Sequence, residues 1–235
     1  MTANLVVDVL ERLGHDTTAF TQGLEFHEGR LYESRGLYGR SALTEIDPVT
    51  GAVLRRTDLA DEFFAEGITV VDDRIIQITW REERAFVYDI DTFAVVDEFT
   101  YLGEGWGLCL DEAGAGRRLI MSDGTDVLTF RDPETFAPTG SVDVTLDGAP
   151  LDNINELECV DGLVWANVWL TDSIVVIDPA DGTVVSVIDA RGLLTPAELA
   201  GADVLNGIAR DHDTGRWLIT GKLWPTMFVV DFVPA

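Results

Sequence analysis

Residues 67–80 read GITVVDDRIIQITW: the pair Gly67-Ile68 opens an apolar run, an acidic turn follows, and a second apolar run ends at Trp80. The same order of run, turn and run occurs four more times along the chain. The opening pairs recur at intervals of 44, 40, 49 and 51 residues, and they are Gly23-Leu24, Gly67-Ile68, Gly107-Leu108, Glu156-Leu157 and Gly207-Ile208. Recurrence of one supersecondary unit at such a period indicates a repeat architecture.

Each unit continues with a third apolar run that ends in an acidic turn. Asp-Pro follows this run at Asp47, Asp132 and Asp178, where proline fixes the turn and aspartate bonds back to the backbone. A fourth run is present in four units, whereas the fifth unit ends at Ala235 without room for one. Residues 5–10 precede the first unit as a spare apolar strand.

We therefore predict an all-β fold, a five-bladed β-propeller whose N-terminal strand closes the last blade, because closure removes exposed sheet edges. The predicted single domain spans residues 1–235, with blades at 16–59, 60–101, 102–146, 150–193 and 201–235 plus 4–11. A β-sandwich and a six-bladed ring agree less well with five units and one spare strand. Thr195-Pro196-Ala197-Glu198 has a capping pattern, which predicts one short helix near residues 195–201.

Composition and charge exclude several classes of partner. The formal charge is −26 and the pI is near 4.1, so we expect no nucleic-acid binding, which requires a basic footprint. The sequence contains no apolar run long enough for a membrane helix, and its first residues lack the pattern of a signal peptide. We expect a monomer without membrane contact; the compartment stays open, because a trimmed leader would leave the same sequence.

The cysteines and histidines do not form a recognisable metal-binding pattern. We interpret Cys109 and Cys159 as buried thiols in apolar strands, with a bridge between them as the alternative. His15 and Asp16 are interpreted as a structural hydrogen-bonded pair. We expect no metal ligands and no cofactor, while a structural ion in the channel remains an open question.

The segments around the opening pairs carry amides, carboxylates and aromatic residues where ordinary loops would carry Asp, Gly and Ser. In a ring of blades these segments converge on one face, and aromatic walls around a few polar groups are typical of a small-molecule pocket. Lys222, the one lysine among 16 basic residues, lies in this set, which favours a role for a compact, titratable ammonium. The residues of interest are Phe20, Thr21, Gln22, Phe64, Glu66, Trp80, Trp106, Asn155, Glu156, Trp169, Asn206 and Lys222. Channel-lining structural roles remain the alternative for each residue.

Longer motifs run in order along essentially the whole chain; they include residues 15–24, 32–40, 66–67, 77–80, 105–107, 155–158, 165–169, 205–208 and 221–225. These motifs resemble those of the glutaminyl-peptide cyclotransferases of the plant and bacterial type. The resemblance implies a five-bladed propeller that converts the N-terminal glutamine of peptides or proteins to pyroglutamate and releases ammonia without a catalytic metal.

The resemblance also assigns site residues. It carries over eight residues, to which the chemistry of the reaction gives roles: we expect catalytic roles for Glu66, Lys222 and Asn155, and substrate contacts for Phe20, Gln22, Trp80, Trp106 and Trp169. We expect Glu66 to transfer protons and Lys222 and Asn155 to stabilise the carboxamide oxygen; an ion pair that restrains Glu66 is the alternative role for Lys222. A non-catalytic propeller that binds peptide N-termini, or a protein-interaction scaffold, is the alternative function.

Overall fold

The computed structural model describes residues 2–113 and 116–235, and these residues form strands and turns without a helix. The prediction of an all-β chain is confirmed; residues 1 and 114–115 of the predicted ranges lie outside the description. Three antiparallel four-stranded sheets come first. They contain β2 (Thr21–His27), β3 (Arg30–Arg35), β4 (Ala42–Ile46) and β5 (Val53–Asp58); β6 (Ala65–Val71), β7 (Arg74–Thr79), β8 (Arg84–Asp89) and β9 (Val95–Thr100); and β10 (Leu108–Asp111), β11 (Arg118–Met121), β12 (Val127–Arg131) and β13 (Pro138–Asp143).

The remaining strands form one larger sheet. It contains β14 (Thr145–Leu146), β15 (Ala149–Pro150), β16 (Ile154–Val160), β17 (Leu163–Val168), β18 (Ser173–Asp178), β19 (Thr183–Asp189), β20 (Leu205–Arg210), β21 (Trp217–Gly221), β22 (Thr226–Pro234) and β1 (Ala3–Gly14). The N-terminal strand β1 pairs antiparallel with the C-terminal strand β22, as the spare apolar run predicts. It also pairs in parallel with β19, which joins two four-stranded groups into one sheet.

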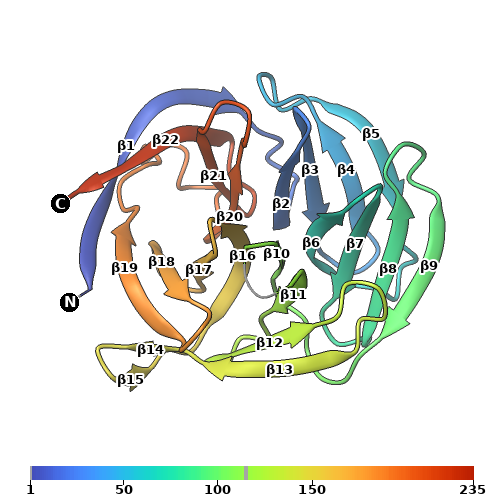
Figure 1. The fold of residues 1–235 in the computed structure, drawn as a ribbon. Helices are drawn as coiled ribbons and strands as arrows, with labels where there is room; N and C mark the ends of the chain where they lie inside the picture. The colour runs from blue at the N-terminus through green and yellow to red at the C-terminus, as the bar shows by residue number, and fades with distance from the viewer. Residues whose placement is uncertain (1, 114–115) are drawn as a thin grey trace.

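The sheets are arranged around a centre, with β2, β6, β10, β16 and β20 innermost and both chain ends at the periphery on the same side (Figure 1). Five separate apolar clusters fill the spaces between neighbouring groups of strands. One cluster contains Leu43 of β4 and Ile75 of β7, and another contains Leu31 of β3 and Val229 of β22. The core is therefore divided among sheet-to-sheet contacts in a propeller-like fold.

The repeated glycine has a steric cause, because the innermost strands approach too closely for a side chain. A Cβ atom on Gly23 would lie 2.7 Å from Ile68 N, one on Gly67 2.6 Å from Leu108 N, and one on Gly107 2.1 Å from the Asn155 carbonyl oxygen. In the fourth unit this position is Glu156, whose buried carboxylate accepts hydrogen bonds from the backbone of β2 and of β20. The sequence repeat thus records where the inner strands meet.

The predicted short helix at 195–201 is wrong. The capping contacts do form, since Thr195 N donates to Glu198 Oε2 at 2.7 Å and Glu198 N lies 3.4 Å from Thr195 Oγ1. The segment nevertheless makes only turns, because Asp203 N donates to the Lys222 carbonyl at 2.8 Å and the chain returns to the sheet before a second helical turn can begin.

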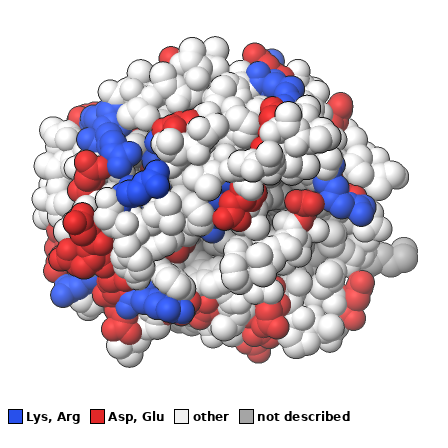
Figure 2. All heavy atoms as spheres, turned by 180° about the vertical axis from the view of Figure 1, so that it is seen from behind, with Lys and Arg blue, Asp and Glu red and all other residues white. Residues whose placement is uncertain are grey.

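Two further observations concern partners. The described residues contain no helix that is long and apolar enough to cross a membrane. On the face shown in Figure 2, the basic side chains are scattered among acidic ones.

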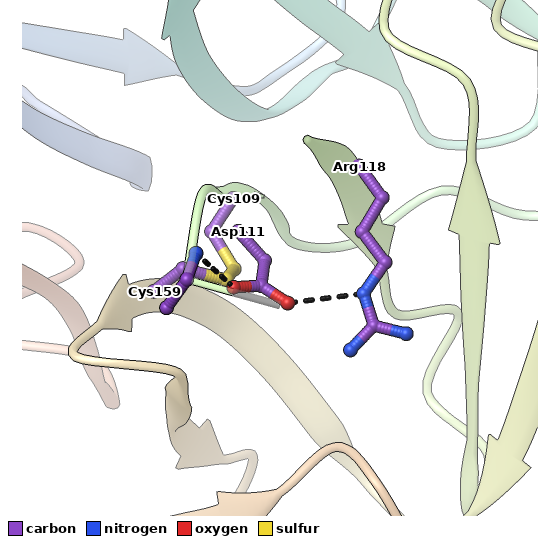
Figure 3. The surroundings of a disulfide bond; sticks show 5 residues. Cys109, Asp111, Arg118 and Cys159 are labelled. Atoms are coloured by element: carbon purple, nitrogen blue, oxygen red, sulfur yellow. Dashed lines mark hydrogen bonds and ion pairs between the residues drawn. A yellow bond between two sulfur atoms is a disulfide. The ribbon is translucent and has the colours of Figure 1, made fainter. Parts of the chain in front are cut away.

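The interpretation of the cysteines as free buried thiols is wrong, because Cys109 of β10 and Cys159 of β16 form a disulfide. Their Cα atoms are 5.4 Å apart and 50 residues separate them in the sequence. Figure 3 shows the bond next to the ion pair between Asp111 and Arg118. Because β10 and β16 are the inner strands of neighbouring sheets, the bond cross-links the centre of the molecule.

We predict that replacing both cysteines by alanine lowers the free energy of unfolding by about 2–4 kcal/mol, because the unfolded chain loses a long closed loop. Equilibrium unfolding in guanidinium chloride measures the change. The wild type under reducing conditions is the matched control and should match the double variant. An unchanged midpoint in both samples would contradict the cross-linking role.

Candidate active site

All eight site residues expected from the sequence line one cavity of about 340 Å³. Phe20 directly precedes β2, Gln22 lies at the start of β2, Glu66 in β6, Trp106 in the segment before β10, and Asn155 in β16. Trp80, Trp169 and Lys222 directly follow β7, β17 and β21. The first strand of a group and the end of its second strand therefore deliver side chains to the same place.

Four further residues line the cavity, namely Leu37, Phe64, Leu170 and Asp203. Phe64 stands among the segments before the opening pairs, but the family resemblance gave it no role. Leu37, Leu170 and Asp203 lie in connecting segments outside the repeated pattern, so periodicity provides no signal for them.

Glu66 is the buried carboxyl group of the pocket, with 4% of its surface exposed. Gln22 Nε2 donates a hydrogen bond to Glu66 Oε1 at 2.9 Å. Burial raises the pKa of Glu66 well above its ordinary value; Lys222 opposes this shift, and the negative charges of Glu104 and Glu82 add to it. Glu66 is therefore predisposed to hold a proton in the substrate-free site.

Lys222 is buried to a similar degree, with 5% exposed. Burial lowers the pKa of its ammonium, while Glu66 and Asp203 oppose that shift. The Nζ atom lies 4.9 Å from the centre of the Phe20 ring, a cation–π contact. Glu66 and Lys222 are both described residues, and no direct ion pair is formed between them.

The turn that presents Lys222 is tightly determined. Leu223 adopts a left-handed backbone with φ of 61°, and its N–H donates to the Ala19 carbonyl at 2.7 Å. A Cβ atom on Gly221 would lie 2.3 Å from the Trp224 indole, so only glycine permits this packing. The motif Gly221–Pro225 thus fixes the ammonium relative to the start of β2.

A buried charge network supports this turn. His15 Nδ1 is 2.8 Å from the Trp224 carbonyl oxygen and Nε2 is 2.9 Å from Glu33 Oε1. The predicted pair between His15 and Asp16 is wrong, since Asp16 instead binds Arg35. Burial lowers and Glu33 raises the pKa of His15, and the net direction is upward. An imidazolium that donates from both nitrogens ties the Lys222 turn to β3.

Aromatic rings form the walls of the pocket. Phe64 packs edge to face against both Phe20 and Trp80, with ring centres 6.1 and 5.6 Å apart. On the other side, Trp106 and Trp169 are in edge-to-face contact at 5.4 Å. Such contacts hold large rings in fixed orientations, so the pocket keeps its shape without a ligand.

Asn155, like Gln22, is a buried amide of the pocket, and its Oδ1 atom has no hydrogen-bond partner. Buried polar atoms without partners are rare in folded proteins and indicate a ligand contact or stored strain. Asn155 can therefore offer both an acceptor and a donor to a bound molecule.

A larger cavity, of about 520 Å³, lies at the opposite ends of the same inner strands. It is lined by Glu25, Glu158 and the disulfide, and it contains none of the site residues expected from the sequence. Among the described residues, no group of three or more His, Cys, Asp or Glu side chains is placed to hold a metal ion.

We predict that Glu66→Gln is more thermostable than the wild type at neutral and alkaline pH. The folded state keeps a proton on Glu66 that the unfolded state releases, so the stability of the wild type falls as pH rises from about 4.5 towards the raised pKa. The Tm of Glu66→Gln should exceed that of the wild type by a margin that grows as pH rises above about 4.5, and the two Tm values should coincide below that pH. A constant Tm difference at every pH would contradict an elevated pKa for Glu66.

Comparisons with known proteins agree with this geometry. The family model described as glutamine cyclotransferase matches residues 1–232. A glutaminyl-peptide cyclotransferase of Arabidopsis thaliana is 39% identical over 230 residues, covering 95% of this chain and 70% of the relative. The crystal structure of Myxococcus xanthus glutaminyl cyclase superposes with a TM-score of 0.89 at 38% identity and full coverage of both chains. The chain therefore belongs to the glutamine cyclotransferase family.

Proposed function

We propose that this pocket converts the N-terminal glutamine of peptides and proteins to pyroglutamate with release of ammonia. The observation that carries the proposal is a buried acid, Glu66, and a buried ammonium, Lys222, inside one cavity walled by aromatic rings. The family and the similarity to glutaminyl cyclases support the same reaction.

Positioning is the first contribution of the pocket. The α-amine and the side-chain carboxamide belong to the same residue, so cyclisation requires only that the side chain fold back on itself. Aromatic walls at Phe20, Trp80, Trp106 and Trp169 hold it in that rotamer, and orientation alone can contribute several kcal/mol, up to about 7–11 in well-oriented intramolecular reactions.

Glu66 transfers the proton. Attack of the neutral amine on the carboxamide carbon forms a C–N bond and leaves a positive charge on the attacking nitrogen and a negative charge on the oxygen. The protonated Glu66 gives its proton to the carboxamide nitrogen, and its carboxylate then takes one from the attacking nitrogen. The C–N bond to the former carboxamide nitrogen breaks, ammonia leaves, and Glu66 is again protonated.

Lys222 stabilises the negative oxygen. The alternative, an ion pair that restrains Glu66, would lower the pKa of Glu66; burial outweighs the influence of Lys222, however, and the net pKa is raised. The ammonium is thus available to a developing oxyanion in a site of low polarity. Asn155 contacts both reacting groups. Its amide N–H donates to the carboxamide oxygen, and its unpartnered Oδ1 accepts from the attacking amine.

Each step uses groups of this chain, so we propose no cofactor for the reaction. The described side chains that line the cavity are chiefly indoles, phenyl rings, leucines and amides, with one ammonium and only two carboxyl groups, Glu66 and Asp203, and with no imidazole or thiol. That donor set falls short of the clusters of carboxylate, imidazole and thiolate ligands that catalytic metals prefer.

We further propose that the fold is a single-domain propeller of five blades. The supporting observations are the strand groups β2–β5, β6–β9, β10–β13, β16–β19 and β20–β22 with β1, which fall within the predicted blade ranges apart from the ends of β1. Five apolar clusters lie between successive groups, and one of them lies between the last group and the first. A closed ring explains that last contact.

The roles of Glu66 and Lys222 predict that a substitution of either residue lowers the rate of ammonia release. Glu66→Gln should lower kcat for ammonia release from a Gln-initiated peptide by about 10²–10⁴-fold, because proton transfer is removed. Lys222→Ala should lower kcat by about 10²–10³-fold, because charge on the oxygen loses its donor. A coupled ammonia assay measures both, with the exposed Glu62→Gln as a charge-matched control.

If Glu66→Gln stays active, the acid assignment is wrong. If Lys222→Ala loses stability in proportion to its activity, the residue is structural. A pocket that binds Gln peptides without releasing ammonia in the wild type would favour a binding protein instead of an enzyme.

Two leucines at the cavity provide a prediction on peptide preference. Leu37 and Leu170 both have left-handed backbones, with φ of 90° and 64°, and Leu170 is 65% exposed. Because strained backbone and exposed apolar side chains concentrate at binding sites, we propose that they contact the residue after the glutamine.

Replacing both leucines by asparagine, which tolerates this backbone, should lower kcat/KM for a Gln-Leu peptide about tenfold. Turnover of glutamine amide, which has no second residue, should not change. Leu102→Asn is the control, because Leu102 is 88% exposed and does not line the cavity. Equal losses on both substrates would contradict a contact with the second residue.

A further inference from the structure

The carboxylate of Glu104 joins two walls of the pocket through one oxygen atom. Glu104 lies between β9 and β10, and its Oε2 accepts hydrogen bonds from Trp80 Nε1 at 2.7 Å and from Trp106 Nε1 at 3.0 Å. Its Oε1 accepts from Arg81 Nε at 2.9 Å. Both indole N–H groups are therefore directed at the same point.

Within the part of the chain that the structure describes, this oxygen links two sets of rings that make no aromatic contact with each other. On one side, Trp80 packs on Phe64, and Phe64 packs on Phe20. On the other side, Trp106 packs on Trp169. The aromatic contacts do not bridge Trp80 and Trp106 directly. The backbone bond from Gly105 N to the Trp80 carbonyl, 2.9 Å long, joins the two segments, and the Glu104 carboxylate joins the two indole rings themselves.

Each indole also has a further close neighbour. The Arg81 guanidinium lies 3.7 Å from the centre of the Trp80 ring. A Cβ atom on Gly124 would lie 2.6 Å from the Trp106 ring, so backbone covers that indole closely. Burial opposes ionisation of Glu104, but the hydrogen bonds from Trp106, Arg81 and Trp80 prevail and lower its pKa. The charged form thus holds the two rings.

We propose that Glu104 is a positioning residue of the cyclisation: it sets the width of the slot between Trp80 and Trp106, and its charge acts on the proton-transferring Glu66. The inference rests on the proposed function for its kinetic part. Its structural part concerns only the two indoles and holds whatever the pocket binds.

The charge of Glu104 acts together with other groups that face Glu66. Lys222 lowers the pKa of Glu66, Glu104 and Glu82 raise it, and Gln22 donates to the carboxyl oxygen. The phenols of Tyr38 and Tyr101 sense the charge of Glu66 in turn. Removing the negative charge of Glu104 alone therefore moves the titration of Glu66 to lower pH, with the other groups unchanged.

Two substitutions separate the effect of the length of the Glu104 side chain from the effect of its charge. Glu104→Asp keeps the charge but is one methylene shorter and cannot meet both indoles; Glu104→Gln keeps the reach and an acceptor oxygen but is neutral. We expect Glu104→Asp to lower kcat/KM for a Gln peptide about tenfold, mainly through KM, with an unchanged pH profile. We expect Glu104→Gln to stay within about threefold of the wild type in KM and to shift the pH profile to lower pH.

Indole N–H resonances provide a readout that does not depend on turnover. In a ¹H–¹⁵N spectrum, Trp80 and Trp106, assigned with Trp80→Phe and Trp106→Phe, should be the indole signals that move most in Glu104→Asp. Glu62→Gln is the control, because it removes an exposed charge elsewhere and should move neither signal. Unmoved indoles in Glu104→Asp would overturn the proposal, and so would an equal rise of KM in both Glu104 variants. Absence of ammonia release by the wild type would instead count against the proposed function, and the indole shifts would still decide the structural part.

Discussion

The close approach of the inner strands is the constraint on which the rest of the structure depends. Gly23, Gly67 and Gly107 leave no space for a Cβ atom against the neighbouring strand, and a side chain there would push the sheets apart. Because the strands meet so tightly at the centre, the segments that enter them also meet. The pocket is thus a consequence of a steric requirement, and Glu156, which replaces glycine once, bonds two other inner strands from the same position.

The pocket concentrates groups that burial disfavours. Glu66 and Lys222 are nearly inaccessible to solvent. Burial raises the pKa of Glu66 and lowers that of Lys222, and both shifts favour the neutral form of the group. Asn155 has a buried amide oxygen without a partner. These groups lower stability, and the five apolar clusters between sheets offset that cost. Polar groups that lower stability in the substrate-free site are already oriented to form hydrogen bonds when substrate binds.

The sequence predicted the features that recur in every repeat. It did not predict features that depend on strand register or on a single long-range contact. The strand order, the closing strand and the shared location of eight side chains follow from the spacing of Gly23, Gly67, Gly107 and Gly207, together with the family resemblance. The disulfide was only the alternative to free thiols, because spacing does not reveal that Cys109 and Cys159 lie opposite each other on neighbouring strands. The helix was wrong because its capping pattern is local, whereas the bond from Asp203 to Lys222 that ends it is long-range. Glu104 was missed because its partners are indole groups, which leave no trace in periodicity.

The choice of lysine at position 222 follows from the same chemistry, in a chain whose other basic residues are arginine. A guanidinium keeps its charge under all conditions and presents a broad planar fork; against the Phe20 ring it would occupy space that the substrate needs. An ammonium is compact, and burial lowers its pKa, so the cost of holding its charge falls when a negative oxygen forms beside it. Burial of Lys222 next to Phe20 therefore makes the ammonium respond more strongly to the transition state than to the resting site, which is the condition for catalysis.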